Sequence, residues 1–264
     1  MKKKFLLLLL ATALTVTTLS TSSCLKNDPP PKAPTETQTG GEYESDKPYL
    51  PEADVNIAKY KLENMDYWFY TPDTVHRDLP LIVYLHDKSD GSTGIDGMIR
   101  KDGPTKAISE GALPINAYVL MPSLSGFGSS WSSARSELKA LIAYVCAAKD
   151  IDTSKVYLTG AGIGATEVYE LALASPNEFA AFAPVGGNIP ANADPASLKN
   201  VRLLAYVSVD IEDPNAASIL DFMFEVGKVN NRAEVFALEN YNANTYVKLY
   251  ADMEYHPLEA LLRN

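Results

Sequence analysis

The sequence predicts an α/β fold in which a mostly parallel central sheet carries helices on both faces. Two continuous apolar runs, LIVYLH (81–86) and AYVLMP (117–122), are typical of strands buried on both faces. Such runs alternate with segments that have apolar residues at helical spacing, for example residues 136–149. Strands and helices that alternate in this way form a parallel sheet between two helical layers.

The individual elements follow in order from residue 55. Residues 55–62 and 67–70 combine alternation with aromatic content, which predicts two antiparallel strands before the buried runs. After the helix at 136–149, KVYLTG (155–160) predicts a further strand, and a helix follows over 163–174 and ends at Ser175-Pro176. The remaining predicted elements are a helix near 216–226 and strands at 180–185, 202–209, 233–238 and 245–250.

The first 23 residues indicate an export signal. Three lysines at 2–4 precede an apolar run that ends near Leu19 and is too short to span a membrane. Thr21-Ser22-Ser23-Cys24 resembles a bacterial lipoprotein signal, in which the cysteine is lipidated; an ordinary secretory peptide cleaved nearby is the alternative. We expect a lipid anchor at Cys24, because Cys146, the other cysteine, lies in an apolar helix pattern that predicts burial.

Residues 24–51 predict a flexible tether, because they are rich in Pro, Thr, Gly and charge and almost lack aliphatic side chains. Residues 52–264 fit a single domain. Without the three signal lysines, 20 basic and 33 acidic residues remain, a net charge of −13 that argues against a nucleic-acid partner. We expect a protein of the cell envelope, held by its lipid at the outer membrane or the periplasmic face.

Consecutive motifs over residues 60–260 resemble the α/β-hydrolase superfamily. These motifs are DYWFYTP, PLIVYLHDKSDG, MPSLSGFGSSW, IDTSKVYLTGAGIGATEVYELALASPNEFAAFAPVGG and LKNVRLLAYVSVDIEDP. They are most similar to secreted bacterial esterases of the feruloyl-esterase and polyhydroxybutyrate-depolymerase kind. The resemblance implies the α/β-hydrolase fold and a Ser–Asp–His triad in that chain order. It also implies an oxyanion hole formed by the loop after strand 81–86 and the residue after the serine.

The nucleophile position of this family falls on a glycine. The turn that reads G-x-S-x-G in a serine hydrolase is here Gly160-Ala161-Gly162-Ile163-Gly164. Glycine adopts the sharp turn without strain but carries no oxygen, and neither neighbour is a nucleophile. The sequence therefore predicts a degenerate catalytic triad.

The other site positions also depart from the family pattern. The acid position falls on Asp210 or Asp213, although a solvated acidic loop explains both equally well. The base position falls on Met253, with His256 either a substitute base or a residue at the entry to a helix. Related proteins often have His-Gly-Gly after the first buried strand; here Asp87 and Lys88 follow His86, and a carboxylate there would oppose an oxyanion.

We expect a vestigial pocket that takes a small molecule or a glycan and a chain that acts as a binding or interaction protein. The alternative is a weak or altered hydrolase of the esterase or peptidase type, acting on an ester or a carbohydrate-linked substrate. Trp131 fits a pocket or ordinary packing equally well. The residues expected to line the pocket are His86, Asp87, Lys88, Trp131, Ala161, Ile163 and Tyr206.

No cofactor and no metal are expected. Gly160-x-Gly162-x-x-Ala165 matches the dinucleotide fingerprint, but the next strand ends in Val185-Gly186-Gly187-Asn188 and lacks the carboxylate that would hold a ribose. The turn also follows several predicted strands, whereas the fingerprint belongs to a first βαβ unit. No two histidines are close in sequence, and the acidic residues at 210–213 lack the spacing of a calcium loop.

Overall fold

A computed structural model describes residues 56–73, 78–88, 94–209, 215–242, 245–252 and 256–263. The predicted signal at 1–23, the tether at 24–51 and the lipidation residue Cys24 lie outside the described residues. So do Asp210, Asp213 and Met253. Those expectations therefore stay predictions.

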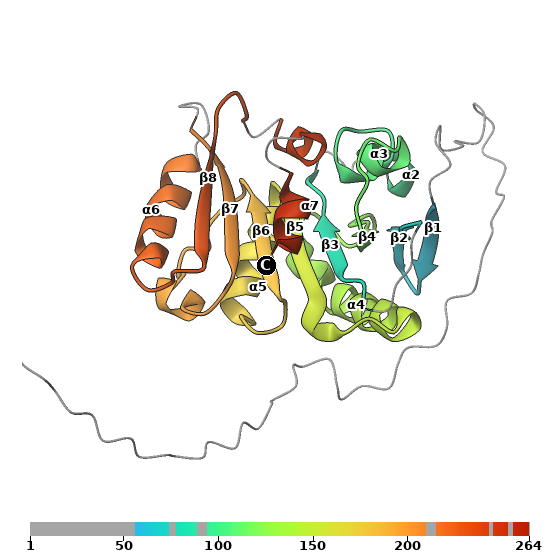
Figure 1. Ribbon diagram of the computed structural model, residues 1–264, viewed down its shortest axis with the longest axis horizontal. Coiled ribbons are helices and arrows are strands. Elements are labelled where there is room, and N and C mark those ends of the chain that lie inside the picture. The colour runs from blue at the N-terminus through green and yellow to red at the C-terminus, as the bar shows by residue number, and fades with distance from the viewer. Residues whose placement is uncertain are drawn as a thin grey trace, which may run out of the picture.

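The described chain forms a sheet in the order β1-β2-β4-β3-β5-β6-β7-β8 (Figure 1). β1 pairs with β2 and β2 with β4 in antiparallel fashion, and all the other pairs are parallel. The predicted mostly parallel sheet is confirmed. Its strands are β1 (Ile57–Leu62), β2 (Met65–Tyr70), β3 (Leu81–Leu85), β4 (Tyr118–Pro122), β5 (Val156–Ala161), β6 (Ala181–Val185), β7 (Leu203–Ser208) and β8 (Ala233–Leu238).

Helices cover both faces of the sheet, because side chains of the central strands alternate between two apolar cores. Along β3, Val83 and Leu85 enter one core, whereas Ile82 and Tyr84 enter the other. The first core is closed by α4 (Arg135–Lys149), α5 (Ile163–Ala174) and α6 (Ala216–Gly227). The second core is closed by α2 (Ile95–Met98), α3 (Pro104–Ser109), α7 (Pro257–Leu262) and the 3₁₀ helix η4 (Tyr246–Ala251). Three further 3₁₀ helices are η1 (Trp131–Ala134), η2 (Thr153–Lys155) and η3 (Pro195–Leu198).

The strand predicted at 245–250 is wrong, because this segment forms η4. Its buried residues are Tyr246, Leu249 and Tyr250, which have helical and not alternating spacing. Tyr250 Oη lies 2.8 Å from Thr159 Oγ1 on β5, and its ring meets Tyr84 edge to face. These contacts hold η4 against the sheet as a helical turn.

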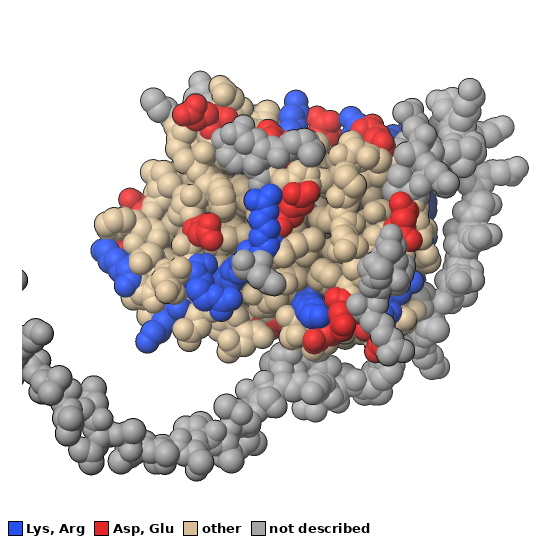
Figure 2. Space-filling view, viewed as in Figure 1, with Lys and Arg blue, Asp and Glu red and all other residues tan. Residues whose placement is uncertain are grey.

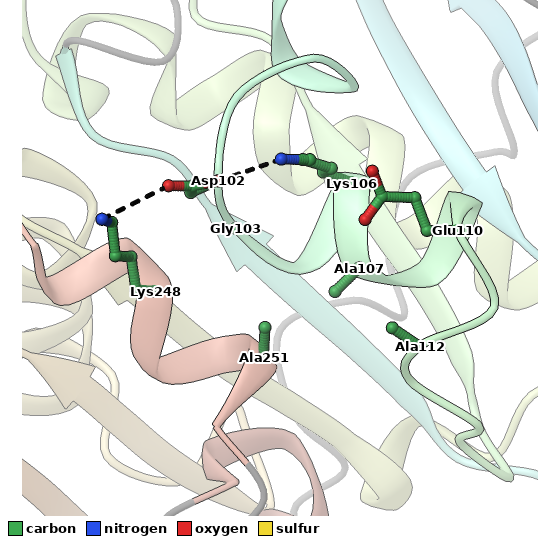
Figure 3. A pocket seen from close by; sticks show the side chains of 8 residues that line it. All are labelled: Asp102, Gly103, Lys106, Ala107, Glu110, Ala112, Lys248 and Ala251. Carbon is green, nitrogen blue, oxygen red and sulfur yellow. Dashed lines mark hydrogen bonds and ion pairs between the residues drawn. The ribbon is translucent and has the colours of Figure 1, made fainter.

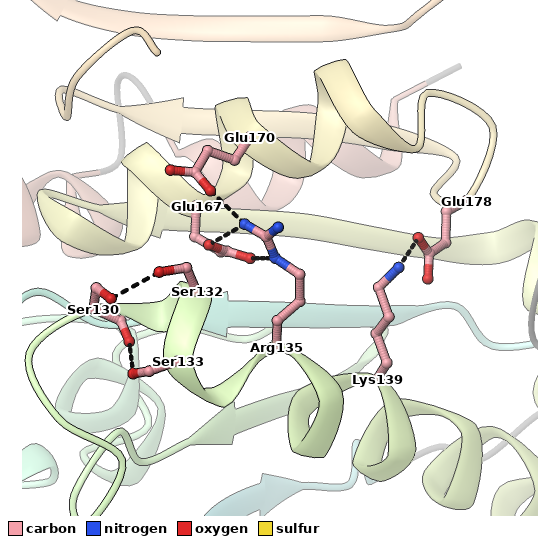
Figure 4. Close-up of polar contacts among 8 residues, drawn as sticks. All are labelled: Ser130, Ser132, Ser133, Arg135, Lys139, Glu167, Glu170 and Glu178. Carbon is pink, nitrogen blue, oxygen red and sulfur yellow. Dashed lines mark hydrogen bonds and ion pairs between the residues drawn. The ribbon is translucent and has the colours of Figure 1, made fainter. Parts of the chain in front are cut away.

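A partly buried ion network joins α4 and α5 behind the sheet (Figure 4). Arg135 on α4 donates to both carboxylate oxygens of Glu167 on α5, at 2.5 and 2.9 Å, and also to Glu170. Lys139 on α4 pairs at 2.7 Å with Glu178, which follows α5. The side chains of Glu167 and Glu178 are only 2% and 4% exposed, so these pairs fix α5 relative to α4. Burial raises the pKa of Glu167, and the hydrogen bonds from Arg135 oppose that shift.

Charged side chains are scattered over the face seen in Figure 2, with large areas of other residues between them.

Cys146, the cysteine in the described residues, is free and buried in α4, and burial raises the pKa of its thiol to about 12. No helix of the described part is long and apolar enough to cross a bilayer.

Candidate functional site

The chain makes a sharp turn at Gly162, between the end of β5 and the start of α5. Gly162 has φ 54° and ψ −117°, a left-handed conformation that glycine adopts without strain. Its N–H donates to the carbonyl of Val185 on β6 at 3.3 Å. The turn therefore lies at the carboxyl edge of the parallel strands, where ligand sites form in α/β sheets.

The glycines on either side of this turn are required by packing. A Cβ on Gly160 would lie 2.7 Å from the Leu85 carbonyl oxygen, and one on Gly164 would lie 2.0 Å from the same atom. Both glycines thus let the start of α5 approach the end of β3. This requirement accounts for the outer glycines of the G-x-G-x-G turn without any ligand.

The space next to Gly162 is filled by a carboxylate. A Cβ on residue 162 would lie 2.0 Å from Asp87 Oδ1 and 2.4 Å from its Cγ. Asp87 Oδ1 accepts a hydrogen bond of 2.9 Å from the N–H of Ile163, the first residue of α5. A carboxylate is favoured there because the first N–H groups of a helix lack intrahelical partners and carry partial positive charge. Asp87 therefore caps α5 from the loop after β3.

His86 is a structural link beside this carboxylate. Its buried ring accepts a hydrogen bond at Nε2 from the N–H of Leu124, at 3.0 Å. Nδ1 then carries the proton and donates to the carbonyl of Asp87 at 2.6 Å. Burial lowers the pKa of His86. With both nitrogens engaged, the neutral ring joins the loops after β3 and β4 and offers no lone pair to a substrate.

The residues expected to line one pocket are divided between the two cores. Trp131 is 1% exposed in the core behind α4 and α5, and its Nε1–H donates to the carbonyl of His86 at 3.0 Å. Tyr206 is fully buried on the opposite face, stacked on Phe236 with ring centroids 4.6 Å apart. The two therefore do not share a pocket, because the sheet separates them. The structure brings together only part of the expected set, around the turn: Ala161 is buried, Asp87 and Ile163 are partly exposed, and Lys88 is exposed.

His256 lies at the start of α7, as one of the two sequence interpretations expected. Its backbone has φ 30°, and its side chain is buried against the core on the α7 side. Neither ring nitrogen has a hydrogen-bond partner among the described residues; Glu259 Oε1 lies 3.9 Å from Nδ1. Burial lowers the pKa of His256, and the Glu259 carboxylate acts in the opposite direction. Within the described chain, no contact joins the imidazole to Gly162 or Asp87.

Tyr246 forms a wall of the site that sequence reasoning missed. A Cβ on Gly186, just after β6, would lie 2.2 Å from the Tyr246 ring, so the ring covers the end of that strand. Its hydroxyl accepts a hydrogen bond from the N–H of Ser208 at 3.0 Å. The helical spacing of Tyr246, Leu249 and Tyr250 was the signal that could have placed this ring against the sheet.

The described residues contain no group of three or more histidine, cysteine or carboxylate side chains that could hold a metal ion. The dinucleotide fingerprint offers no free anion site at Ile163 either, because the N–H of Ile163 already binds the Asp87 carboxylate. A phosphate at that position would have to displace a group of the same charge.

No protein-family model matches the sequence, and no curated protein matches it by sequence. Solved structures are similar to it. A thermostable esterase gives a TM-score of 0.58 at 15% identity, over 78% of this chain and 62% of that one. The chain thus spans less than two thirds of that esterase.

Two other esterases are similar over nearly their whole length. A mutant of the feruloyl esterase module from Clostridium thermocellum, complexed with sinapinate, gives a TM-score of 0.54 at 14% identity. The match covers 82% of this chain and 97% of that one. Acetyl xylan esterase from Aspergillus awamori gives a TM-score of 0.52 at 15% identity, over 73% of this chain and 94% of that one. The chain therefore has the α/β-hydrolase fold that the sequence motifs implied.

Proposed function

We propose that this chain uses the α/β-hydrolase fold for binding or interaction and not for covalent catalysis. The observation that carries the proposal is the position of Asp87. Its carboxylate fills the space where the side chain of a nucleophile would begin and accepts the N–H of Ile163. In this fold the residue after the nucleophile supplies one N–H of the oxyanion hole, and here that residue is Ile163.

Two steps of ester hydrolysis lack their chemical group in this arrangement. Gly162 has no oxygen with which to form an acyl intermediate. The Ile163 N–H, which would stabilise a developing oxyanion, is bound to a negative group already. An oxyanion at this point would have to displace Asp87 or lie against it, and either event raises the energy of the transition state.

A weak or altered hydrolase is the second candidate, and the esterase neighbours favour it. His256 is the residue that could activate water, since its ring nitrogens have no hydrogen-bond partner among the described residues. General-base catalysis alone supplies about 10²–10⁴-fold acceleration, so turnover of an ester or a carbohydrate-linked substrate would be slow.

Hydrolysis of p-nitrophenyl acetate by the purified full chain separates the two candidates. The non-catalytic proposal predicts a rate no higher than that of a non-enzymatic protein at the same concentration. It also predicts no change in His256→Ala. Saturable turnover that His256→Ala abolishes would overturn the proposal and establish the weak hydrolase.

The proposed setting is the cell envelope, with the chain held by a lipid on Cys24 and the domain carried on the 24–51 tether. The sequence around Cys24 supports this placement. Cells that express the chain should carry it in the membrane fraction, and Cys24→Ala should release it. Retention of Cys24→Ala in the membrane fraction would refute the lipid anchor. The folded domain would then offer its binding surface, for a small molecule or a glycan, outside the cytoplasm.

A further inference from the structure

A cavity of about 320 Å³ lies between α3 and η4, away from the turn at Gly162 (Figure 3). It opens on the side of the sheet that carries α2, α3 and α7. None of the residues 160–164, His86 or Asp87 lines it. Its lining residues are Asp102, Gly103, Lys106, Ala107, Glu110, Ala112, Lys248 and Ala251. The cavity lies within the usual volume range of small-molecule sites.

The floor of this cavity is made of small apolar groups. Figure 3 shows the methyl groups of Ala107, Ala112 and Ala251 directed into the hollow from α3, from the loop after it and from η4. Among the described residues, no larger hydrophobic side chain is part of the lining. The floor therefore suits the apolar part of a small ligand.

One end of the cavity has two ammonium groups around one carboxylate. Asp102 Oδ1 lies 3.1 Å from Lys106 Nζ, and Asp102 Oδ2 lies 3.7 Å from Lys248 Nζ. The second distance is longer than a hydrogen bond, and Lys248 Nζ makes no hydrogen bond to any residue in the described part of the chain. This end can donate hydrogen bonds to a ligand carboxylate, and its described residues, two lysines and Asp102, carry one positive charge in excess.

The other end of the cavity is acidic. Glu110 follows α3, opposite the Lys248 side, and forms no ion pair with another described residue. Its carboxylate can accept hydrogen bonds from a ligand ammonium. The lining therefore places hydrogen-bond donors and an acceptor on either side of an apolar floor.

We propose that this cavity binds a small zwitterion with an apolar body, a free amino acid or a short peptide. The ligand carboxylate would bind Lys248 and Lys106, its ammonium would bind Glu110, and its side chain would lie on the alanine floor. A dianion would be opposed by Asp102 and Glu110, and a neutral sugar would leave the excess positive charge at the lysine end and the negative charge of Glu110 uncompensated. The proposal does not depend on whether the turn at Gly162 is inactive.

Three forms of one amino acid test the two ends of the cavity separately. L-leucine carries both charges, N-acetyl-leucine only the carboxylate and leucinamide only the ammonium. Saturation-transfer NMR with the purified full chain should show saturable binding of leucine. The two capped forms should bind about tenfold more weakly or worse, because each loses one charged hydrogen bond. Equal binding of all three forms, binding of glucose in place of leucine, or no binding of leucine would overturn the proposal.

Variants then locate the binding in this cavity. Lys248→Gln and Glu110→Gln should each weaken leucine binding about tenfold. Ala251→Leu should abolish it by filling the floor, and Ala251 is exposed, so the domain should stay folded by circular dichroism. Lys228→Gln, just after α6, is the matched control, because this exposed lysine pairs with Glu225 and lies outside the cavity; binding should not change. Leucine binding that survives in Ala251→Leu, or that Lys228→Gln weakens as much as Lys248→Gln does, would overturn the proposal.

Discussion

Gly162→Ser restores the residue type of a hydrolase turn, yet we predict that it lowers the free energy of unfolding by about 3 kcal/mol. The new Cβ would lie 2.0 Å from Asp87 Oδ1. The carboxylate must therefore retreat by about 1.4 Å before the contact reaches ordinary van der Waals distance. That movement breaks the hydrogen bond from the Ile163 N–H.

Two separate costs make up this magnitude. A side chain at φ 54° adds backbone strain of about 1–2 kcal/mol. The lost hydrogen bond between Asp87 and Ile163 adds about 1–2 kcal/mol, at the low end for a charged acceptor because Asp87 is partly exposed and water replaces some of the interaction.

Gly94→Ser is the control for a side chain at positive φ, because Gly94 has φ 70° and a Cβ there would meet no atom of the described residues within 4 Å. Gly94→Ser also adds a side chain at positive φ, at ψ −170° where Gly162 has ψ −117°, but it does not displace Asp87. Urea denaturation followed by circular dichroism should therefore give a loss about 1–2 kcal/mol larger for Gly162→Ser than for Gly94→Ser. Equal losses would refute the position that we assign to Asp87.

A double-mutant cycle with Asp87→Ala provides a second test of the same contact. Asp87→Ala and Gly162→Ser each remove the hydrogen bond to Ile163, so the double variant cannot lose it twice. The cycle should show a coupling of about 1–2 kcal/mol. Additive losses would contradict this reasoning, because they would mean that the two side chains act independently.

Further predictions concern the ion network, the buried histidines and Trp131. Arg135→Gln leaves the buried Glu167 carboxylate without its main partner and should cost about 2–3 kcal/mol at pH 7, less than the loss of a fully buried pair because Arg135 is 32% exposed. Burial raises the pKa of Glu167 and protonation removes the unpaired charge, so this deficit should shrink in denaturation at pH 5; a larger deficit there would refute the explanation. Because burial lowers the pKa of His86 and of His256, the unfolded chain binds more protons below their ordinary value of 6.5. The free energy of unfolding should therefore fall as pH drops below that value, and it should fall less steeply in His256→Leu. Identical pH dependence in the two proteins would count against a lowered pKa of His256. Trp131→Phe removes the donor to the His86 carbonyl and should cost about 1–2 kcal/mol in urea, and no loss would show that this bond does not hold the loop.

The sheet and the turn could be predicted from the sequence because their signals are local. Apolar runs at 81–86, 117–122 and 155–160 became β3, β4 and β5, and the glycine-rich segment after β5 became the turn. Long apolar strands and glycines at fixed spacing leave few alternatives. The helix predicted at 163–174 has the same bounds in the structure.

The contact at the site could not be predicted, because it joins residues far apart in the chain. Asp87 and Ile163 are separated by 76 positions, and only the parallel pairing of β3 with β5 brings them together. The sequence indicated that a carboxylate at residue 87 would oppose an oxyanion. It did not indicate that this carboxylate fills the space beside Gly162.

The assignment of aromatic residues to one pocket failed for a similar reason. Trp131 lies in η1, after β4, and Tyr206 lies on β7. Their side chains enter different cores. The face that Tyr206 takes is set by the register of β7, and the core that Trp131 enters is set by where η1 packs. Both depend on partners that local sequence does not specify. Residues 245–250 were misassigned because their aromatic and β-branched content favoured a strand, although Tyr246, Leu249 and Tyr250 have helical spacing.

Labelling of the full chain with a fluorophosphonate probe, read by intact mass, tests whether the chain lacks covalent catalysis. This probe forms a covalent adduct with an activated serine. An active serine esterase labelled in the same mixture is the positive control, and circular dichroism shows that the chain is folded. We predict no adduct on the folded chain, because residue 162 is a glycine and the Ile163 N–H binds Asp87. A stoichiometric adduct would reveal a reactive serine elsewhere and would contradict the proposal that the chain is non-catalytic.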